Sequence, residues 1–274
     1  MTFKSFFKWN NQGLLGALVF LLILGACKDP QEEDSNVFAN FDFQGMAENY
    51  QTVASEELDS LHQQLVLLRN QLQLTTAQNQ LDSLKSELSE AMLAYQDVEA
   101  FEWGKASQAN FRLHCNTFPV DTAQLNDLVA DSNYNFDALS HIATQGFPAL
   151  DYLIFAGNDS EVIERLNNGP GFRVYADTVL GYMIALIDEI KGADLGLEVS
   201  LSGAFGPFGV VGRLVNEMVY TYELSVRARV GIPLGKYSAE IPLPEKVEAV
   251  FSGESTELLE ANLRAIQQMY LGYP

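Results

Sequence analysis

Two segments of the chain carry polar side chains that could bind a ligand together. Carboxylate, guanidinium, amide and phenol groups recur in them, and on the second segment several are spaced so that they share one helical face. The candidate ligand-binding residues are Asp151, Tyr152, Arg213, Asn216, Glu223 and Arg227. Such groups form hydrogen bonds and ion pairs with charged ligands. We therefore predict that both segments contribute to one ligand-binding site.

Simpler roles are open for the same residues. Glu223 and Arg227 are four residues apart, a spacing that is typical of an ion pair on the surface of one helix. Asp151 follows a possible helix start at Pro148, where a carboxylate interacts favourably with the helix dipole. Tyr152 and Phe155 also suit a hydrophobic core. The sequence leaves both interpretations open.

The sequence contains none of the common catalytic motifs. It has no His-Glu-x-x-His, no Gly-x-Ser-x-Gly, no Cys-x-x-Cys and no glycine-rich phosphate loop. The three histidines are His62, His114 and His141. A metal site requires several ligands that converge in space. The weak candidates for metal ligands are His141 and Asp151, and iron or another divalent metal is the cofactor they would hold.

The first 26 residues have the layout of an export signal. Lys4 and Lys8 are followed by an uncharged, leucine-rich stretch at 13–26, which is too short to span a bilayer. This stretch ends in Leu-Gly-Ala before Cys27, and the four residues resemble a lipobox. We predict that Cys27 is lipidated and becomes the first residue of the mature protein. The alternative is an ordinary signal peptide with an incidental cysteine.

Residues 27–43 are predicted to be a flexible acidic tether. The segment begins Cys-Lys-Asp-Pro-Gln-Glu-Glu-Asp and has too few apolar residues to fold alone. A cysteine followed by lysine and acids resembles the surface-export signal of Bacteroidota lipoproteins, although a plain linker fits equally well. The expected location is therefore the cell envelope, anchored in the outer membrane through the lipid on Cys27 and facing the periplasm or the cell surface.

The charge and the cysteine content of the chain indicate which partners and which bonds are not expected. The formal net charge of −20 disfavours binding to nucleic acid and to anionic membrane surfaces. After Cys27 the chain has one further cysteine, Cys115, so an intrachain disulfide is not expected once Cys27 is lipidated. An isolated thiol of this kind is expected to be buried.

The rest of the chain is predicted to be all-α. Leucines at steps of three and four residues mark two long antiparallel helices, which suggest a bundle core, with a coiled-coil partner site as the alternative. Pro148 requires the next helix to start there or to kink. A break at 157–160 marks the boundary between two sub-domains. The expected helices span 46–73, 77–107, 137–155, 172–191, 210–229, 245–252 and 255–271.

Several motifs resemble the imelysin family, also called imelysin-like peptidases. The segment from Gln145 to Phe155 is similar to the family's signature region, which carries Gly-x-His-x-x-Glu followed by an apolar run. Further segments that resemble the family, in order along the chain, are 95–106, 212–216, 222–223, 230–235, 244–253 and 263–271. Each match is weak alone, but their order within a lipoprotein makes the set specific. The resemblance covers about residues 45–272.

The resemblance implies two helical bundles with a cleft between them. The bundles would span 44–157 and 158–274, and the second would be incomplete at its C-terminus because relatives continue through more helices. It also implies an envelope role linked to iron uptake, and the family carries the historical label of metallopeptidase. Here, however, Pro148 takes the place of the family histidine and Asp151 that of the family glutamate. Proline has no ligand atom, so a hydrolytic metal site is hard to sustain.

These observations favour a non-catalytic, ligand-binding envelope lipoprotein. Its ligand would be connected with iron or haem uptake, and its partners would be iron or haem uptake proteins and the membrane that holds the lipid anchor. Two alternatives remain, namely a metallopeptidase of the imelysin type and a structural or interaction lipoprotein.

Overall fold

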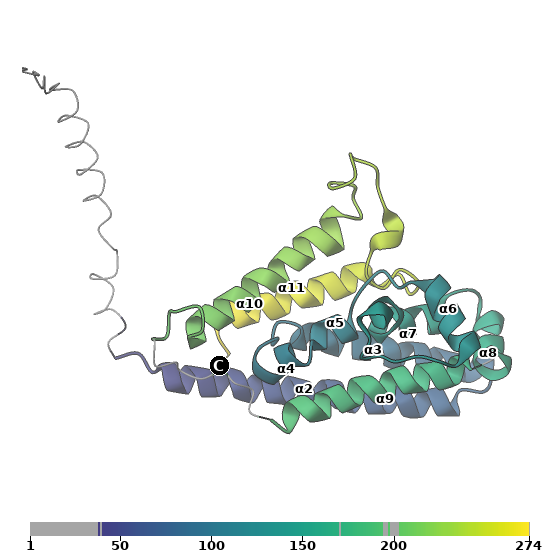
Figure 1. Ribbon diagram of the computed structural model, residues 1–274, viewed down its shortest axis with the longest axis horizontal. Helices are drawn as coiled ribbons and strands as arrows, with labels where there is room; N and C mark the ends of the chain where they lie inside the picture. Colours follow the sequence, from purple (N-terminus) through teal and green to yellow (C-terminus); the bar gives the residue numbers. More distant parts are fainter. Residues whose placement is uncertain (1–37, 39, 170, 194–196, 198–202, 274) are drawn as a thin grey trace, which may run out of the picture. The chain divides into compact units, whose positions relative to one another are not determined.

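A computed structural model describes residues 38, 40–169, 171–193, 197 and 203–273. Within these residues the protein is all-α, with helices joined by turns and without a β-strand, which confirms the predicted fold class (Figure 1). The predicted signal peptide and Cys27 lie outside the described residues. No helix in the described part of the chain is long and apolar enough to cross a membrane.

Four helices form the main bundle. The hairpin of α2 (Phe43–Leu74) and α3 (Leu81–Val98) packs against α7 (Gly146–Phe155) and α9 (Phe172–Lys191) (Figure 1). The leucine stripe of α2 faces this core, and its buried members are Leu58, Leu61, Leu65, Leu68 and Leu72. Burying each of these side chains contributes roughly 2 kcal/mol. The stripe is therefore bundle core, so it is not free to bind a partner.

The second long helix is shorter than predicted. It ends at Val98 instead of near residue 107, and two short helices follow, α4 (Gly104–Gln108) and α5 (Phe111–Cys115). The break coincides with left-handed backbone at Gly104 and Asn110, which a continuous helix cannot contain. Cys115, at the end of α5, is buried as expected.

Helix α7 begins at Gly146 and carries Pro148 in its first turn. Because the first N–H groups of a helix have no partner within it, a proline there causes no loss of hydrogen bonds. The helix expected from residue 137 thus starts later, after a 3-10 segment at Leu139–Thr144. The shorter helices α6 (Thr122–Asp131) and α8 (Asp159–Asn168) cover the α7 end of the bundle.

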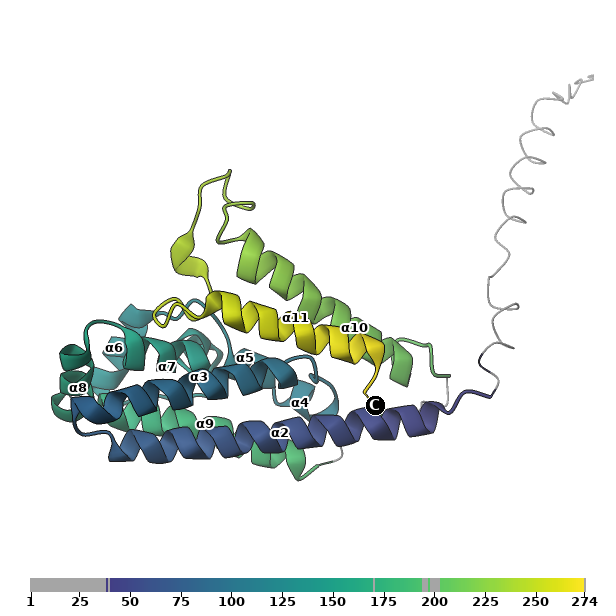
Figure 2. The same cartoon turned by 180° about the vertical axis from the view of Figure 1, so that it is seen from behind.

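The last part of the chain is a helix pair. Helix α10 (Val210–Leu224) continues into a π-helix, Ser225–Gly231, and packs against α11 (Ser255–Leu271), which also contacts α3 (Figure 2). The expected helix at 245–252 is wrong, since only a 3-10 turn at Pro244–Lys246 forms there. Exposed apolar side chains on α10 and α11 include Val215, Val219, Tyr222, Leu263 and Tyr270.

Residues 43–274 form one compact unit. The predicted division of the chain into two bundles, 44–157 and 158–274, stays a prediction.

Candidate functional site

A cleft with a volume of about 510 Å³ has a strongly charged lining. One wall comes from the end of α3 and from the α4–α5 segment, and the other comes from α10 and the π-helix. Its charged lining residues are Glu99, Glu102, Arg112, Glu217 and Arg229. Its apolar lining includes Leu113, Phe118, Tyr220 and Leu224.

Arg229 is buried in this wall between two carboxylates. Its Nη2 donates to both carboxylate oxygens of Glu99 at 2.9 Å, and its Nε donates to Oε2 of Glu248 at 2.5 Å. Only 2–4 % of these three side chains is exposed to solvent. A buried cation requires this kind of pairing, because an unpaired charge is costly outside water.

The π-helix directs Arg229 inward. Ser225 lies four residues earlier and is also buried, and its hydroxyl donates to Asn262 on α11 at 2.6 Å. Asn262 in turn donates to Glu99 at 2.6 Å. One strip of the π-helix thus joins α3 and α11 at the base of the cleft. π-Helical turns are rare and frequently occur at functional sites.

Arg112 forms a second charged group nearer the cleft surface. Its Nη2 donates to Glu217 at 3.0 Å and to the backbone carbonyl of Glu99 at 2.8 Å. Its guanidinium lies over the ring of Tyr220, 4.9 Å from the centroid. The Glu102 carboxylate accepts from the backbone N–H of Arg112 at 3.1 and 3.3 Å.

The electrostatics of the cleft follow from burial. Burial raises the pKa of Glu102 to about 7, although the nearby charge and N–H of Arg112 oppose the shift. Burial lowers the pKa of Arg229, but Glu99 and Glu248 outweigh it and raise that pKa above its ordinary value. Arg229 is therefore a fixed cation, and Glu102 is a carboxyl group that titrates near neutral pH.

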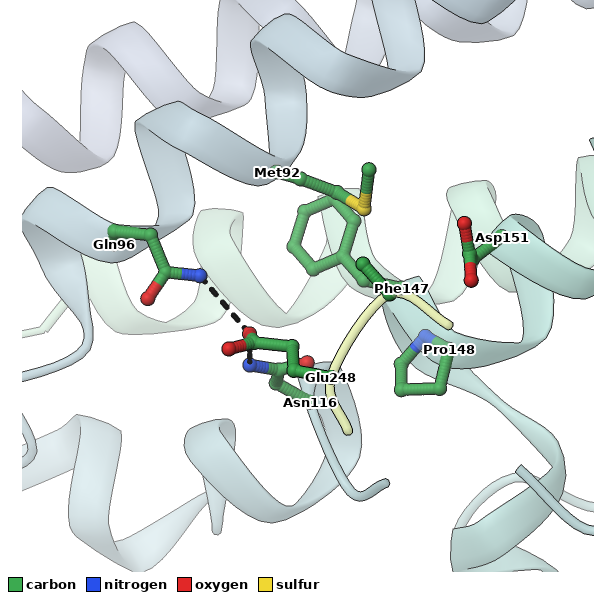
Figure 3. A pocket seen from close by; sticks show the side chains of 8 residues that line it. Met92, Gln96, Asn116, Phe147, Pro148, Asp151 and Glu248 are labelled. Carbon is green, nitrogen blue, oxygen red and sulfur yellow. Dashed lines mark hydrogen bonds between the residues drawn. The ribbon is translucent and has the colours of Figure 1, made fainter. Parts of the chain in front are cut away.

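The signature region surrounds a much smaller cavity of about 10 Å³ (Figure 3). Pro148 and Asp151 line it together with Met92, Phe147 and Glu248. This volume is at most that of one water molecule. The cavity therefore cannot take a ligand larger than water.

Asp151 is already committed to the backbone. Its Oδ2 accepts from the N–H of Phe251 at 2.9 Å, and its Oδ1 accepts from the N–H of Ser252 at 2.9 Å. Burial raises the pKa of Asp151, and these hydrogen bonds oppose the shift. Because Pro148 offers no ligand atom, the residues of the signature region do not fit a metal ion.

None of the three histidines lines either cavity. Nδ1 of His141 lies 2.9 Å from the backbone oxygen of Asn135, and Nδ1 of His114 lies 3.2 Å from Nε2 of Gln145. His62 pairs with Asp188 at 3.2 Å. Across the described residues, no group of three or more His, Cys, Asp or Glu side chains is arranged to hold a metal ion.

The structure does not bring the six predicted ligand-binding residues together. On α10 and the π-helix, Asn216, Glu223 and Arg227 are exposed, and the last two form an ion pair at 2.6 Å. Arg213 is half-buried. The cleft is lined instead by the neighbouring face, which carries Glu217, Tyr220, Leu224, Ala228 and Arg229.

Tyr152 lies beside α6, away from the residues that line the cleft. Its hydroxyl donates to Asn126 at 3.3 Å and accepts from the same amide at 3.1 Å. Its ring packs against Phe251 at 5.2 Å and lies beneath the guanidinium of Arg165. Tyr152 therefore packs against the same loop that Asp151 holds.

Sequence reasoning did not identify Glu99, Arg229 and Glu248. Glu99 lies in the segment 95–106, which resembles the imelysin family, but nothing in its spacing linked it to Arg229, 130 positions later. Arg229 lies on the same side of the π-helix as Ser225, and both are buried. A buried ion pair between distant segments leaves no local periodicity that could indicate it.

The chain is similar to one family model and to solved structures. A family model described as Imelysin matches residues 46–273. Among solved structures, a Parabacteroides distasonis protein named as an iron-regulated protein A precursor is 14% identical, with a TM-score of 0.54, over 83% of this chain and 73% of that one. An imelysin-like protein from Psychrobacter arcticum is 17% identical, with a TM-score of 0.44, over 85% of this chain and 72% of that one. No curated protein matches the chain.

Proposed function

This chain belongs to the imelysin family, and on that premise we propose that it is an envelope lipoprotein that binds a ligand for iron or haem uptake without cleaving peptides. The lipid on Cys27 would hold it to the outer membrane, facing the periplasm or the cell surface. Its partners would be the iron or haem uptake proteins that deliver or receive the ligand.

The cleft beside Arg112 and Arg229 is the observation that carries this proposal. Its volume of about 510 Å³ lies within the range of small-molecule sites. Its wall holds fixed charges in defined positions, since Arg112 and Arg229 are each held by glutamates. Such preorganised polar groups in a partly apolar cleft give orientation and specificity to a bound ligand.

The proposed connection with iron rests on similarity to another protein. The Parabacteroides distasonis relative is named as an iron-regulated protein, and we extend that connection to this chain as part of the proposal. Iron or an iron complex would be cargo in the cleft. The signature region does not enter this role, because Asp151 is committed to two backbone N–H groups.

Calorimetric titration of the mature lipoprotein in detergent with ferric iron, ferrous iron and haem tests the proposal. We expect heat of binding with at least one of the three, and at least a tenfold weaker affinity in the cleft variant Arg112→Ala. The matched control is Arg227→Ala, which removes an exposed arginine of the π-helix that does not line the cleft and should leave the affinity unchanged. No heat and no thermal shift with any of the three would defeat the proposal.

Peptidase activity is the competing function. Purified protein is incubated with casein or insulin, with and without a chelator, beside an Asp151→Ala variant. The proposal expects no cleavage that is sensitive to the chelator. Cleavage that is lost both with chelator and in Asp151→Ala would instead support a metallopeptidase.

A further inference from the structure

Asp151 and the cleft are joined by the short loop at 248–252. We infer that Asp151 is a positioning residue, which holds this loop so that Glu248 keeps Arg229 in place in the cleft wall. The position that carries a glutamate in the family signature would thus act here through the loop and through Glu248.

At its far end the loop is held by α7. Both oxygens of the buried Asp151 carboxylate accept a backbone N–H, one from Phe251 and one from Ser252, each at 2.9 Å. Two hydrogen bonds from consecutive residues to one carboxylate fix the orientation of that stretch of backbone. A substitution that removes either acceptor leaves a backbone N–H without its present partner.

At its near end the loop presents Glu248. This buried carboxylate accepts from Gln96 at 3.0 Å and from Asn116 at 2.6 Å (Figure 3). It also accepts from Arg229 at 2.5 Å. The donors come from α3, from the end of α5 and from the π-helix. Arg229 and Asn116 line the cleft, so the loop residue Glu248 supports two of its lining side chains.

Hydrogen bonds within the loop stabilise its backbone between the two ends. A displacement of one end should therefore displace the other. Ala249 has a left-handed backbone with φ of 50°, and its carbonyl accepts from the N–H of Gly253 at 3.0 Å and from the hydroxyl of Ser252 at 3.3 Å. The hydroxyl of Ser255 donates to the carbonyl of Glu248. Only two residues separate Glu248 from the Phe251 amide, so the backbone between them has little freedom to absorb a displacement.

The inference can be tested without a ligand, so it does not depend on iron or haem binding. The readout is the Arg229 Nε–H resonance in an NMR spectrum of the isotope-labelled mature lipoprotein in detergent. A buried N–H that donates to a carboxylate is expected to give a resolved, slowly exchanging signal. In Asp151→Asn, one acceptor becomes an NH₂ group that faces a backbone N–H. We expect the Arg229 signal to shift and its exchange to accelerate at least tenfold.

The matched control is Asp121→Asn, because Asp121 also accepts a backbone N–H, from Gln124 at 3.0 Å, but caps α6. It should leave the Arg229 signal unchanged. An unchanged Arg229 signal in Asp151→Asn, with faster exchange confined to Phe251 and Ser252, would overturn the inference.

The reciprocal variant Glu248→Gln keeps the test decisive should Asp151→Asn not fold. It removes the charge that Arg229 contacts, and the inference expects faster exchange of the Phe251 and Ser252 amides. Unchanged protection of both amides would count against the coupling. The NMR results for both variants do not depend on whether the protein binds iron or haem in the titrations.

Discussion

Arg229 and Glu99 form a two-point contact in which one guanidinium nitrogen lies 2.9 Å from both carboxylate oxygens. The pair connects the end of α3 with the π-helix that follows α10. Both side chains are almost fully buried, so the pair has no access to the water that would solvate either charge alone. Removing one partner should therefore cost far more than breaking an exposed ion pair.

Replacing Arg229 with methionine should lower the free energy of unfolding by about 3–5 kcal/mol, because Glu99 and Glu248 would be left as uncompensated buried carboxylates. Urea denaturation at neutral pH measures the loss. The control is Arg227→Met, two residues away on the same π-helix, where an exposed pair with Glu223 is broken and no measurable change is expected. Equal losses in the two variants would contradict the burial of Arg229.

Glu102 should make the stability of the protein depend on pH. Its pKa is raised by burial from 4.5 to about 7, so between these values the folded state binds more protons than the unfolded state. The contribution of Glu102 is thus fully present below pH 4.5 and is lost as the pH rises through 7. The largest loss that this shift allows is about 3 kcal/mol.

The Glu102→Gln variant isolates this effect. A glutamine still accepts from the Arg112 N–H but does not ionise, so the variant should gain stability relative to the wild type between pH 5 and pH 8. Parallel urea denaturation at both values gives the difference. Asp97, whose pKa burial raises to about 6, is present in both proteins and cancels. A wild-type–variant difference that is the same at both pH values would show that Glu102 has an ordinary pKa.

Local patterns in the sequence were sufficient to predict the long helices α2, α9 and α11. The leucines of α2, at steps of three and four, face the bundle core as their spacing requires. Pro148 left two possibilities, a helix start or a kink, because its ring does not fit an unbroken helix interior, and the structure has the start, since α7 begins two residues before it. These features depend only on residues within one or two turns.

The charged site could not be predicted in the same way. Glu99 lies just beyond the true end of α3, inside what the sequence suggested was a continuous helix to residue 107. Arg229 lies in the π-helix that follows α10, and its carboxylate partners Glu99 and Glu248 are 130 and 19 residues away in the chain. Asp151 was identified by its family position, but its partners are backbone N–H groups a hundred residues away. Each depends on long-range packing, which periodicity does not encode.

Tyr95 carries a buried polar group that is not paired in the described part of the chain, in contrast to Arg229 and Glu99. Its ring is fully buried, and its hydroxyl has no hydrogen-bond partner among the described residues. An unsatisfied buried hydroxyl opposes folding, so Tyr95→Phe should leave the free energy of unfolding unchanged or raise it by about 1 kcal/mol. In the matched variant Tyr175→Phe, the hydroxyl that donates to the Thr144 carbonyl at 2.7 Å is lost.

Thermal and urea unfolding of both phenylalanine variants provide the measurement. Tyr175→Phe should lose about 1–2 kcal/mol, because a buried hydrogen bond is broken and the Thr144 carbonyl loses its donor. A clear loss of stability in Tyr95→Phe would show that this hydroxyl has a hydrogen-bond partner in solution, such as a buried water molecule.

Gly146 is required by a close approach between two backbones at the start of α7. Its φ is 70°, and a Cβ there would collide with the carbonyl oxygen of Cys115. Gly203 also has a positive φ, 101°, but a Cβ there would meet no atom within 4 Å. Gly203→Ala therefore measures the cost of the left-handed backbone alone, about 1–2 kcal/mol. Gly146→Ala adds the collision, and its loss in urea denaturation should be at least about 2 kcal/mol larger. Equal losses would mean that α7 can move away from Cys115, and the signature helix would then be less firmly seated than its contacts indicate.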